Sequence, residues 1–169
     1  MAYHGSTVSI PKPQIIRGDR VGDFGIGFYT TTDLDQARRF VHRKCAIEGC
    51  IEGCDRGYVS VYSVSDDILN CKDLKTLSFE TANEAWIEFV FANRRDPSFE
   101  QDNDLVYGPV ANDQVYASLS LFEDGQIGYD ELIKRLLSRK LVDQLLFHTE
   151  KALSYLRYVT SMEVSCPVL

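Results

Sequence analysis

Two hydrophobic periodicities are mixed along the chain, and their order is the feature that most constrains the fold. Residues 57–64 alternate with a period of two, as in a half-buried strand, whereas Leu34, Ala37, Phe40 and Val41 recur at the spacing of a helix. Strand patterns come first, and helices and strands then follow in mixture. This order predicts an α+β fold with a largely antiparallel or split sheet.

The same patterns, together with the turn residues, place the other elements. Helices are expected over residues 33–46, 83–96, 129–139 and 150–156, and strands over 57–64, 104–111, 142–149 and 156–164. Pro109 predicts a kink, because proline cannot donate to a central ladder. Trp86 and Phe89 are predicted to lie in the core. No linker or repeat divides the 169 residues, so we expect a single domain over 1–169.

The charge of the chain limits its partners. The net charge is −7 and the sequence pI is about 4.9, so a broad attraction to phosphate backbones is absent and a protein partner is favoured over nucleic acid. The dense basic spots, Arg38-Arg39, Arg43-Lys44 and Arg94-Arg95, are interpreted as solvated helix faces. No apolar run approaches the roughly 18 to 20 residues that span a bilayer. We therefore expect no membrane contact and a cytoplasmic location, with delivery to another cell without a cleaved signal left open.

Three of the five cysteines, Cys45, Cys50 and Cys54, lie within ten positions. Their spacing, with His42 as the nearby fourth donor, is an incomplete match to the paired ligands of a zinc site. An odd cysteine count without a secretory signal favours reduced thiols. We interpret the cluster as small thiols at a helix end and its loop, and expect no metal.

Tyr3-His4-Gly5-Ser6 is the first segment that points to chemistry, at the end of the expected first strand. Gly5 lets a flat ligand approach the backbone, whose N–H and C=O can pair with a carboxamide. His4 and Ser6 can hydrogen-bond a ribose and an amide. Taken alone, the segment is more often a strand end followed by a turn.

The second segment is Gly25-Ile26-Gly27-Phe28-Tyr29, where two glycines precede adjacent aromatic residues. Such glycines permit strained backbone and close packing, and an aromatic face beside them can stack on a planar heterocycle. Taken alone, it is more often a turn that leads into a strand with core aromatics. It is not the dinucleotide-binding Gly-x-Gly-x-x-Gly fingerprint, because the third glycine and the strand-turn-helix context are absent.

Together, in this order and separation, the two segments resemble the ADP-ribosyltransferase superfamily, in particular the branch of the poly(ADP-ribose) polymerases and diphtheria toxin. That branch has His-Gly-Ser or His-Gly-Thr on its first strand and Gly-x-Gly-x-Tyr-Phe-like residues at the start of the next. Residues 23–31, 108–113 and 147–153 are also similar to a bacterial domain family of unassigned function, usually placed in this superfamily. The resemblance implies split antiparallel β-sheets flanked by helices.

The resemblance also implies NAD as cosubstrate and a role for each matching residue. His4 would hydrogen-bond the ribose on the nicotinamide side, Gly5 would hold the carboxamide through its backbone, and Tyr29 would stack on the nicotinamide ring. The implied binding set is Tyr3, His4, Gly5, Ser6, Gly27, Phe28, Tyr29 and Asp113. Fixing the nicotinamide helps to break its glycosidic bond and leaves an oxocarbenium-like carbon for an acceptor to attack.

The third catalytic position of that family is a glutamate at the start of a late strand, and the matching residue is Gln144. Glutamine can hydrogen-bond the ribose but cannot take a proton, so the acceptor is activated otherwise or the activity is reduced. Asp113 and Glu150 are rival carboxylates, and the sequence does not choose among the three. His148, on a strongly apolar strand, is interpreted as a satisfied core histidine.

The activity implied by the resemblance is transfer of one ADP-ribose from NAD to a macromolecule, most simply a protein, as by a bacterial toxin or effector. A toxin would have a neutralising partner protein. Hydrolysis of NAD is a related reaction. The alternative from another class is a binding module for NAD or ADP-ribose that keeps the cleft but has lost catalysis, and Gln144 is the feature that favours it.

Overall fold

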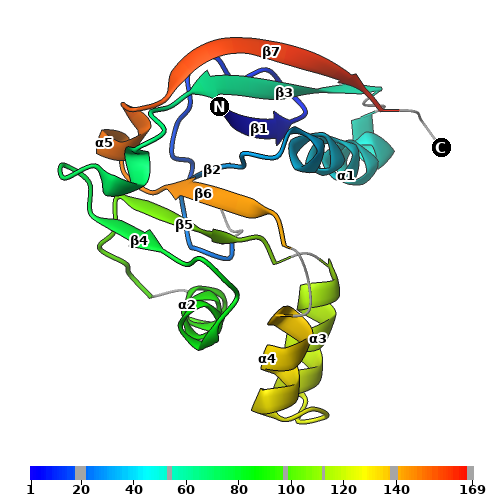
Figure 1. Cartoon of the computed structure of the whole chain (residues 1–169). Helices are drawn as coiled ribbons and strands as arrows, with labels where there is room; N and C mark the ends of the chain where they lie inside the picture. The colour runs from blue at the N-terminus through cyan, green and yellow to red at the C-terminus, as the bar shows by residue number, and fades with distance from the viewer. Residues whose placement is uncertain (18–21, 53–54, 97–98, 112, 138–140, 167–169) are drawn as a thin grey trace.

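A computed structural model describes residues 1–17, 22–52, 55–96, 99–111, 113–137 and 141–166, without the side chains of 47–52, 113 and 114. The strands form two sheets (Figure 1). The three-stranded sheet has the order β1 (Ala2–Ser6), β3 (Arg56–Ser63), β7 (Arg157–Ser165). The four-stranded sheet has the order β2 (Phe28–Thr30), β6 (Asp143–Phe147), β5 (Leu105–Pro109), β4 (Thr76–Ser78).

Neighbouring strands pair antiparallel except β4 and β5, which are parallel. The helices are α1 (Leu34–Glu52), α2 (Glu84–Arg95), α3 (Asp113–Glu123), α4 (Tyr129–Leu137) and α5 (Glu150–Leu153), with a single 3₁₀ turn among the described residues, η1 (Ile68–Asn70). This arrangement confirms the predicted α+β class with split sheets flanked by helices. No helix in the described ranges is long and apolar enough to cross a membrane.

Three clusters of buried side chains join the layers. α1 covers one face of the three-stranded sheet, where Val41 and Cys45 pack on Val59. The second cluster lies between the two sheets and includes Tyr62 and Phe147. The third lies between the four-stranded sheet and α2, α3 and α4, which Figure 1 shows on the side away from β3 and β7; its buried members include Trp86, Val115, Leu132 and Leu146.

α1 packs closely on β1 and β3 because both strands carry a glycine beneath it. A Cβ at Gly5 would lie 2.5 Å from the carbonyl oxygen of Ala37, and a Cβ at Gly57 would lie 3.2 Å from Sγ of Cys45. Any side chain at either position would push the helix away. The space beside Gly5 is therefore filled by α1.

Several boundaries differ from the sequence predictions. α1 continues to Glu52 instead of ending near residue 46. α3 was not predicted, because its buried stripe of Val115, Ser118 and Leu119 includes a serine and reads as only weakly apolar. Pro109 is the last residue of β5, and β4 pairs only as far as Tyr107, so the proline removes no ladder bond on that side.

Candidate functional site

β1 and β2 meet at one isolated bridge and then separate. The N–H of Tyr3 donates to the carbonyl of Thr31 at 2.8 Å, and the N–H of Thr31 donates back at 3.0 Å. A continued antiparallel ladder would next pair Gly5 with Tyr29. Among the described residues no hydrogen bond joins those two main chains, and each strand pairs on its other side within its own sheet. The two sheets therefore split at this point, which we call the β1–β2 split.

The main chain of Gly5 faces the β1–β2 split. Residues two apart on a strand direct their N–H and C=O to the same edge, so those of Gly5 point toward β2 as those of Tyr3 do. This edge presents one donor and one acceptor side by side. A primary carboxamide, with its own C=O and NH₂, is complementary to such a pair.

The imidazole of His4 fills part of the split. Its Nδ1 lies 2.7 Å from the carbonyl oxygen of Tyr29, and its ring stacks on Phe28 with centroids 4.4 Å apart. Because a carbonyl only accepts, Nδ1 carries the proton. Burial lowers the pKa of His4 from its ordinary value, the hydrogen bond to Tyr29 opposes this, and the charge of Lys44 adds to it. The neutral ring leaves Nε2 as a hydrogen-bond acceptor.

Tyr29 connects the split to the opposite face of β2. Its phenol hydroxyl donates to the carbonyl of Gly25 at 2.7 Å and accepts from the N–H of Phe24 at 3.0 Å, while burial raises its pKa well above the usual range. Its ring packs against the buried cluster between the four-stranded sheet and α2, α3 and α4, whereas the ring of Phe28 packs between the sheets. The structure thus brings the main chain of Tyr29, rather than its ring, next to His4. Stacking of that ring on nicotinamide stays a prediction.

The two glycines of the second segment shape the turn that covers the Tyr29 hydroxyl. Gly25 has a φ of +99°, which favours glycine, and a Cβ there would lie 2.6 Å from Oδ1 of Asn93. A Cβ at Gly27 would lie 2.6 Å from the carbonyl oxygen of Phe147. Backbone geometry and close packing thus account for both glycines, and the implied binding role of Gly27 stays a prediction.

Asp23 is a buried carboxylate at the start of this turn, with 6% of its surface exposed, and three donors converge on it. Its Oδ1 accepts from the hydroxyl of Tyr116 at 2.7 Å. Its Oδ2 accepts from the N–H of Ala111 at 3.2 Å and from Nε2 of Gln144 at 3.3 Å. The same Nε2 donates to the carbonyl of Pro109 at 3.3 Å. We call these residues the Asp23 cluster.

Sequence reasoning assigned no role to Asp23 or Tyr116, although residue 23 opens one of the segments that carry the resemblance. The available signal was an acidic residue directly before a run of glycines and aromatics, since a charge beside such a run is either solvated or paired in the interior. The hydroxyl of Tyr116 could not be predicted as a donor to Asp23, because α3, which carries it, was not predicted.

Residues 1–158 match the family described as "Protein of unknown function (DUF3990)". The chain belongs to the DUF3990 family. No curated protein matches the chain, and neither does any solved structure. The residues of the β1–β2 split and of the Asp23 cluster all lie within the matched part of the DUF3990 chain.

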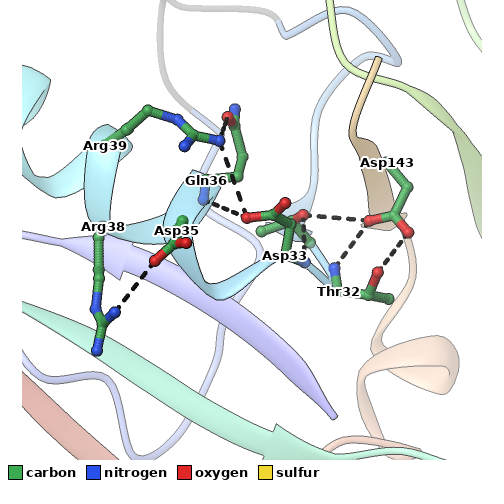
Figure 2. A network of polar contacts seen from close by, with 8 residues as sticks. Thr32, Asp33, Asp35, Gln36, Arg38, Arg39 and Asp143 are labelled. Carbon is green, nitrogen blue, oxygen red and sulfur yellow. Dashed lines mark hydrogen bonds and ion pairs between the residues drawn. The ribbon is translucent and has the colours of Figure 1, made fainter. Parts of the chain in front are cut away.

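Asp143, the neighbour of Gln144 in β6, ties the four-stranded sheet to the start of α1. Its Oδ1 accepts from the N–H of Thr32 at 2.8 Å, and its Oδ2 accepts from the hydroxyl of the same residue at 2.5 Å (Figure 2). Asp33 then caps α1 by accepting from the N–H of Gln36 at 2.6 Å. These contacts hold α1 against the end of β6 that carries Gln144.

The remaining residues that the sequence singled out lie on four different parts of the fold. Ser6 is the half-buried last residue of β1. Asp113 begins α3, and its side chain lies outside the described part of the chain. Glu150 is exposed in the first turn of α5, which follows the opposite end of β6 from Gln144. His148 is half-buried, and its Nδ1 donates to the carbonyl of Ile26 at 2.6 Å.

The cysteine prediction falls partly outside the described residues. Cys45 is buried on the face of α1 that packs against Val59 of β3, while Cys54 and the side chain of Cys50 are not described. Within the described ranges no group of three His, Cys, Asp or Glu side chains is arranged to hold a metal ion.

Two surface hollows lie away from the split. One, of about 340 Å³, is formed by the start of α2 and by α4, and its lining includes Glu84 and Leu137. The other, of about 530 Å³, lies where β3 ends and β7 begins, and its lining includes Ser63 and Arg157. Neither is lined by His4, Gly5 or Gln144, so a ligand at either place would leave the β1–β2 split empty.

Proposed function

We propose that this DUF3990 chain is an NAD-dependent mono-ADP-ribosyltransferase of the ADP-ribosyltransferase superfamily, with the nicotinamide half of NAD at the β1–β2 split. The observation that carries the proposal is the end of the β1–β2 ladder after one bridge, which leaves the N–H and C=O of Gly5 facing the split. The neutral imidazole of His4 stands beside that edge with Nε2 as an acceptor.

These groups match the nicotinamide riboside half of NAD. The carboxamide pairs with the Gly5 main chain, and a ribose hydroxyl donates to Nε2 of His4. Holding ring and ribose in one orientation favours scission of the bond between them. The bond breaks with its electron pair passing to the nicotinamide nitrogen, which becomes neutral. A nucleophile of the acceptor then bonds to the sugar carbon and loses its proton to water.

A protein is the proposed acceptor, because the net charge of −7 disfavours a polyanionic one. A delivered effector or toxin with a neutralising partner protein is the setting that the resemblance suggests. Transfer to water, which is NAD hydrolysis, uses the same bond scission and differs only in the nucleophile.

One observation favours the second candidate function, a binding module without catalysis. Gln144 stands where the superfamily pattern has glutamate, and its Nε2 is held by Asp23 and Pro109. An amide held in this way accepts a hydrogen bond but takes no proton from an acceptor. Such a site retains the means to bind NAD or ADP-ribose.

Incubation of the full chain with NAD, followed by chromatography of free nicotinamide, separates the two functions. The enzyme releases nicotinamide, and His4→Ala abolishes the release, whereas the same change at the exposed His42 on α1 leaves it unchanged. A binding module shows an NAD-dependent rise in Tm without nicotinamide release. If the chain shows neither response, both functions are wrong.

A further inference from the structure

Within the Asp23 cluster, the carboxylate of Asp23 contacts the side-chain amide of Gln144. We propose that Asp23 is a positioning residue, which fixes the side-chain amide of Gln144 so that its Oε1 accepts a hydrogen bond from a ribose hydroxyl of the bound dinucleotide. The identity of the ligand rests on the proposed function. The orientation of the amide rests on the contacts alone.

Two acceptors determine which way the Gln144 amide points. Nε2 lies 3.3 Å from Oδ2 of Asp23 and 3.3 Å from the carbonyl oxygen of Pro109. An amide nitrogen has two hydrogens, so both are used. The flipped amide would place Oε1 against two oxygens that cannot donate. Oε1 accepts no hydrogen bond from the described residues, and it remains the one polar atom of the side chain available to a ligand.

Asp23 is itself held by donors from two further segments. The hydroxyl of Tyr116 on α3 donates to Oδ1, and the N–H of Ala111 donates to Oδ2. Burial, and then the negative charge of Asp23, raise the pKa of Tyr116, so that hydroxyl keeps its proton and remains a donor. The guanidinium of Arg94 lies 4.2 Å from the centre of the Tyr116 ring and packs on it. The carboxylate therefore has little freedom to turn away from Gln144.

This arrangement accounts for glutamine at position 144. A glutamate side chain in the same place would direct its carboxylate at Oδ2 of Asp23 and at the carbonyl of Pro109, in a site where residue 144 is only 8% exposed. Like charges that close to one another in a buried site are strongly disfavoured. The negative charge therefore lies on Asp23, which does not contact the ligand in this proposal. Asp23 acts through Gln144 by fixing Oε1 of that side chain as a hydrogen-bond acceptor.

A charge-swap cycle tests the pair, with Asp23→Asn, Gln144→Glu and the double variant. Asp23→Asn removes the negative charge and one of the two acceptor oxygens that three donors share, so the amide of Gln144 is held less firmly. We expect kcat for nicotinamide release to fall about 10-fold, with KM for NAD nearly unchanged. Gln144→Glu alone is expected to lower both kcat and Tm, because two carboxylates then meet. In the double variant the new asparagine can donate to the new glutamate, and kcat should return to within about 3-fold of wild type.

The exposed pair Asp124→Asn and Gln126→Glu, in the turn between α3 and α4, serves as the matched control and should change neither kcat nor Tm. Recovery in the double variant supports the proposal, since two independent structural lesions would not restore one another. A double variant whose losses are the product of the single losses would overturn it.

Failure of the proposed function gives a different pattern. If the wild-type chain binds NAD or ADP-ribose without releasing nicotinamide, the same cycle is read in Kd and Tm, and recovery of both in the double variant supports the positioning role. If the wild-type chain binds neither ligand, the ribose contact is wrong even where Tm recovers. If Asp23→Asn changes kcat, or Kd where the chain only binds, no more than Asp124→Asn does, the positioning role is wrong.

Discussion

The β1–β2 split and the turn before β2 differ in what their polar groups do. At the split, the N–H and C=O of Gly5 face the edge where the ladder has ended, and only Nδ1 of His4 is used by the contact with Tyr29. In the turn, the hydroxyl of Tyr29 and the carboxylate of Asp23 already have partners within the chain. The comparison shows that the polar groups of the second segment are used within the fold, whereas those of the first are the ones that the proposed function assigns to a ligand.

Among these variants, Gly27→Ala, in the turn before β2, is expected to have the largest effect on the free energy of unfolding. The new Cβ meets the side chain of Leu146 and lies 2.6 Å from the carbonyl oxygen of Phe147. Overpacking together with an unfavourable φ should lower the free energy of unfolding by about 3 kcal/mol. Urea titration measures this, and Gly128→Ala, where a Cβ meets nothing within 4 Å, should stay within about 0.5 kcal/mol of wild type.

Two substitutions of His4 separate the role of Nδ1, which bonds Tyr29, from that of Nε2, which is proposed to accept from the ribose. Asparagine can place its NH₂ near the Nδ1 position and keep the bond to Tyr29, but it lacks an acceptor at Nε2. We expect His4→Asn to lower nicotinamide release about 100-fold, which is ~2.7 kcal/mol in the barrier, with a nearly unchanged Tm. His4→Gln, which reaches the Nε2 position, should retain more activity. The reverse order of the two variants would mean that the Nδ1 contact matters for turnover.

Tyr29→Phe is expected to affect stability more than chemistry. Loss of the hydroxyl leaves the N–H of Phe24 and the carbonyl of Gly25 without that partner, in a half-buried place. The expected cost is about 1 to 2 kcal/mol in the free energy of unfolding. If NAD turnover falls far more than stability, as judged by nicotinamide release at a temperature where the variant is fully folded, the phenol has a direct role in the chemistry.

The smallest expected effect is a pH dependence of stability from His4. Its folded-state pKa lies below the ordinary value of 6.5, so the unfolded chain binds more protons in that window. The stability that the neutral ring contributes is complete above 6.5 and is lost as pH falls through the folded-state pKa, by less than about 1.4 kcal/mol per pH unit. Unfolding titrations at several pH values between 7.5 and 5 should give a shallower slope for His4→Asn. Equal slopes would contradict the assigned burial.

The sequence predicted the parts of this molecule that depend on local period. The α+β class, most strands and the helices at 83–96 and 129–139 follow from residue spacing, although boundaries moved. It did not predict α3, whose buried stripe includes Ser118, or the three-residue strand β4, which is too short to show a period. Contacts between segments that are distant in the sequence could not be predicted either. The link between Asp23 and Gln144 spans 121 positions and depends on how two strands and a turn pack.

Amide NMR of the uniformly labelled chain tests the central claim most directly, because it reads the Gly5 N–H itself while nicotinamide or NAD is added. The account predicts that the Gly5 resonance shifts in a saturable way and exchanges more slowly with solvent, while Gly128, in the α3–α4 connection, does not move. An unmoved Gly5 resonance, with shifts confined to the hollow between Ser63 and Arg157 or absent throughout, would contradict it.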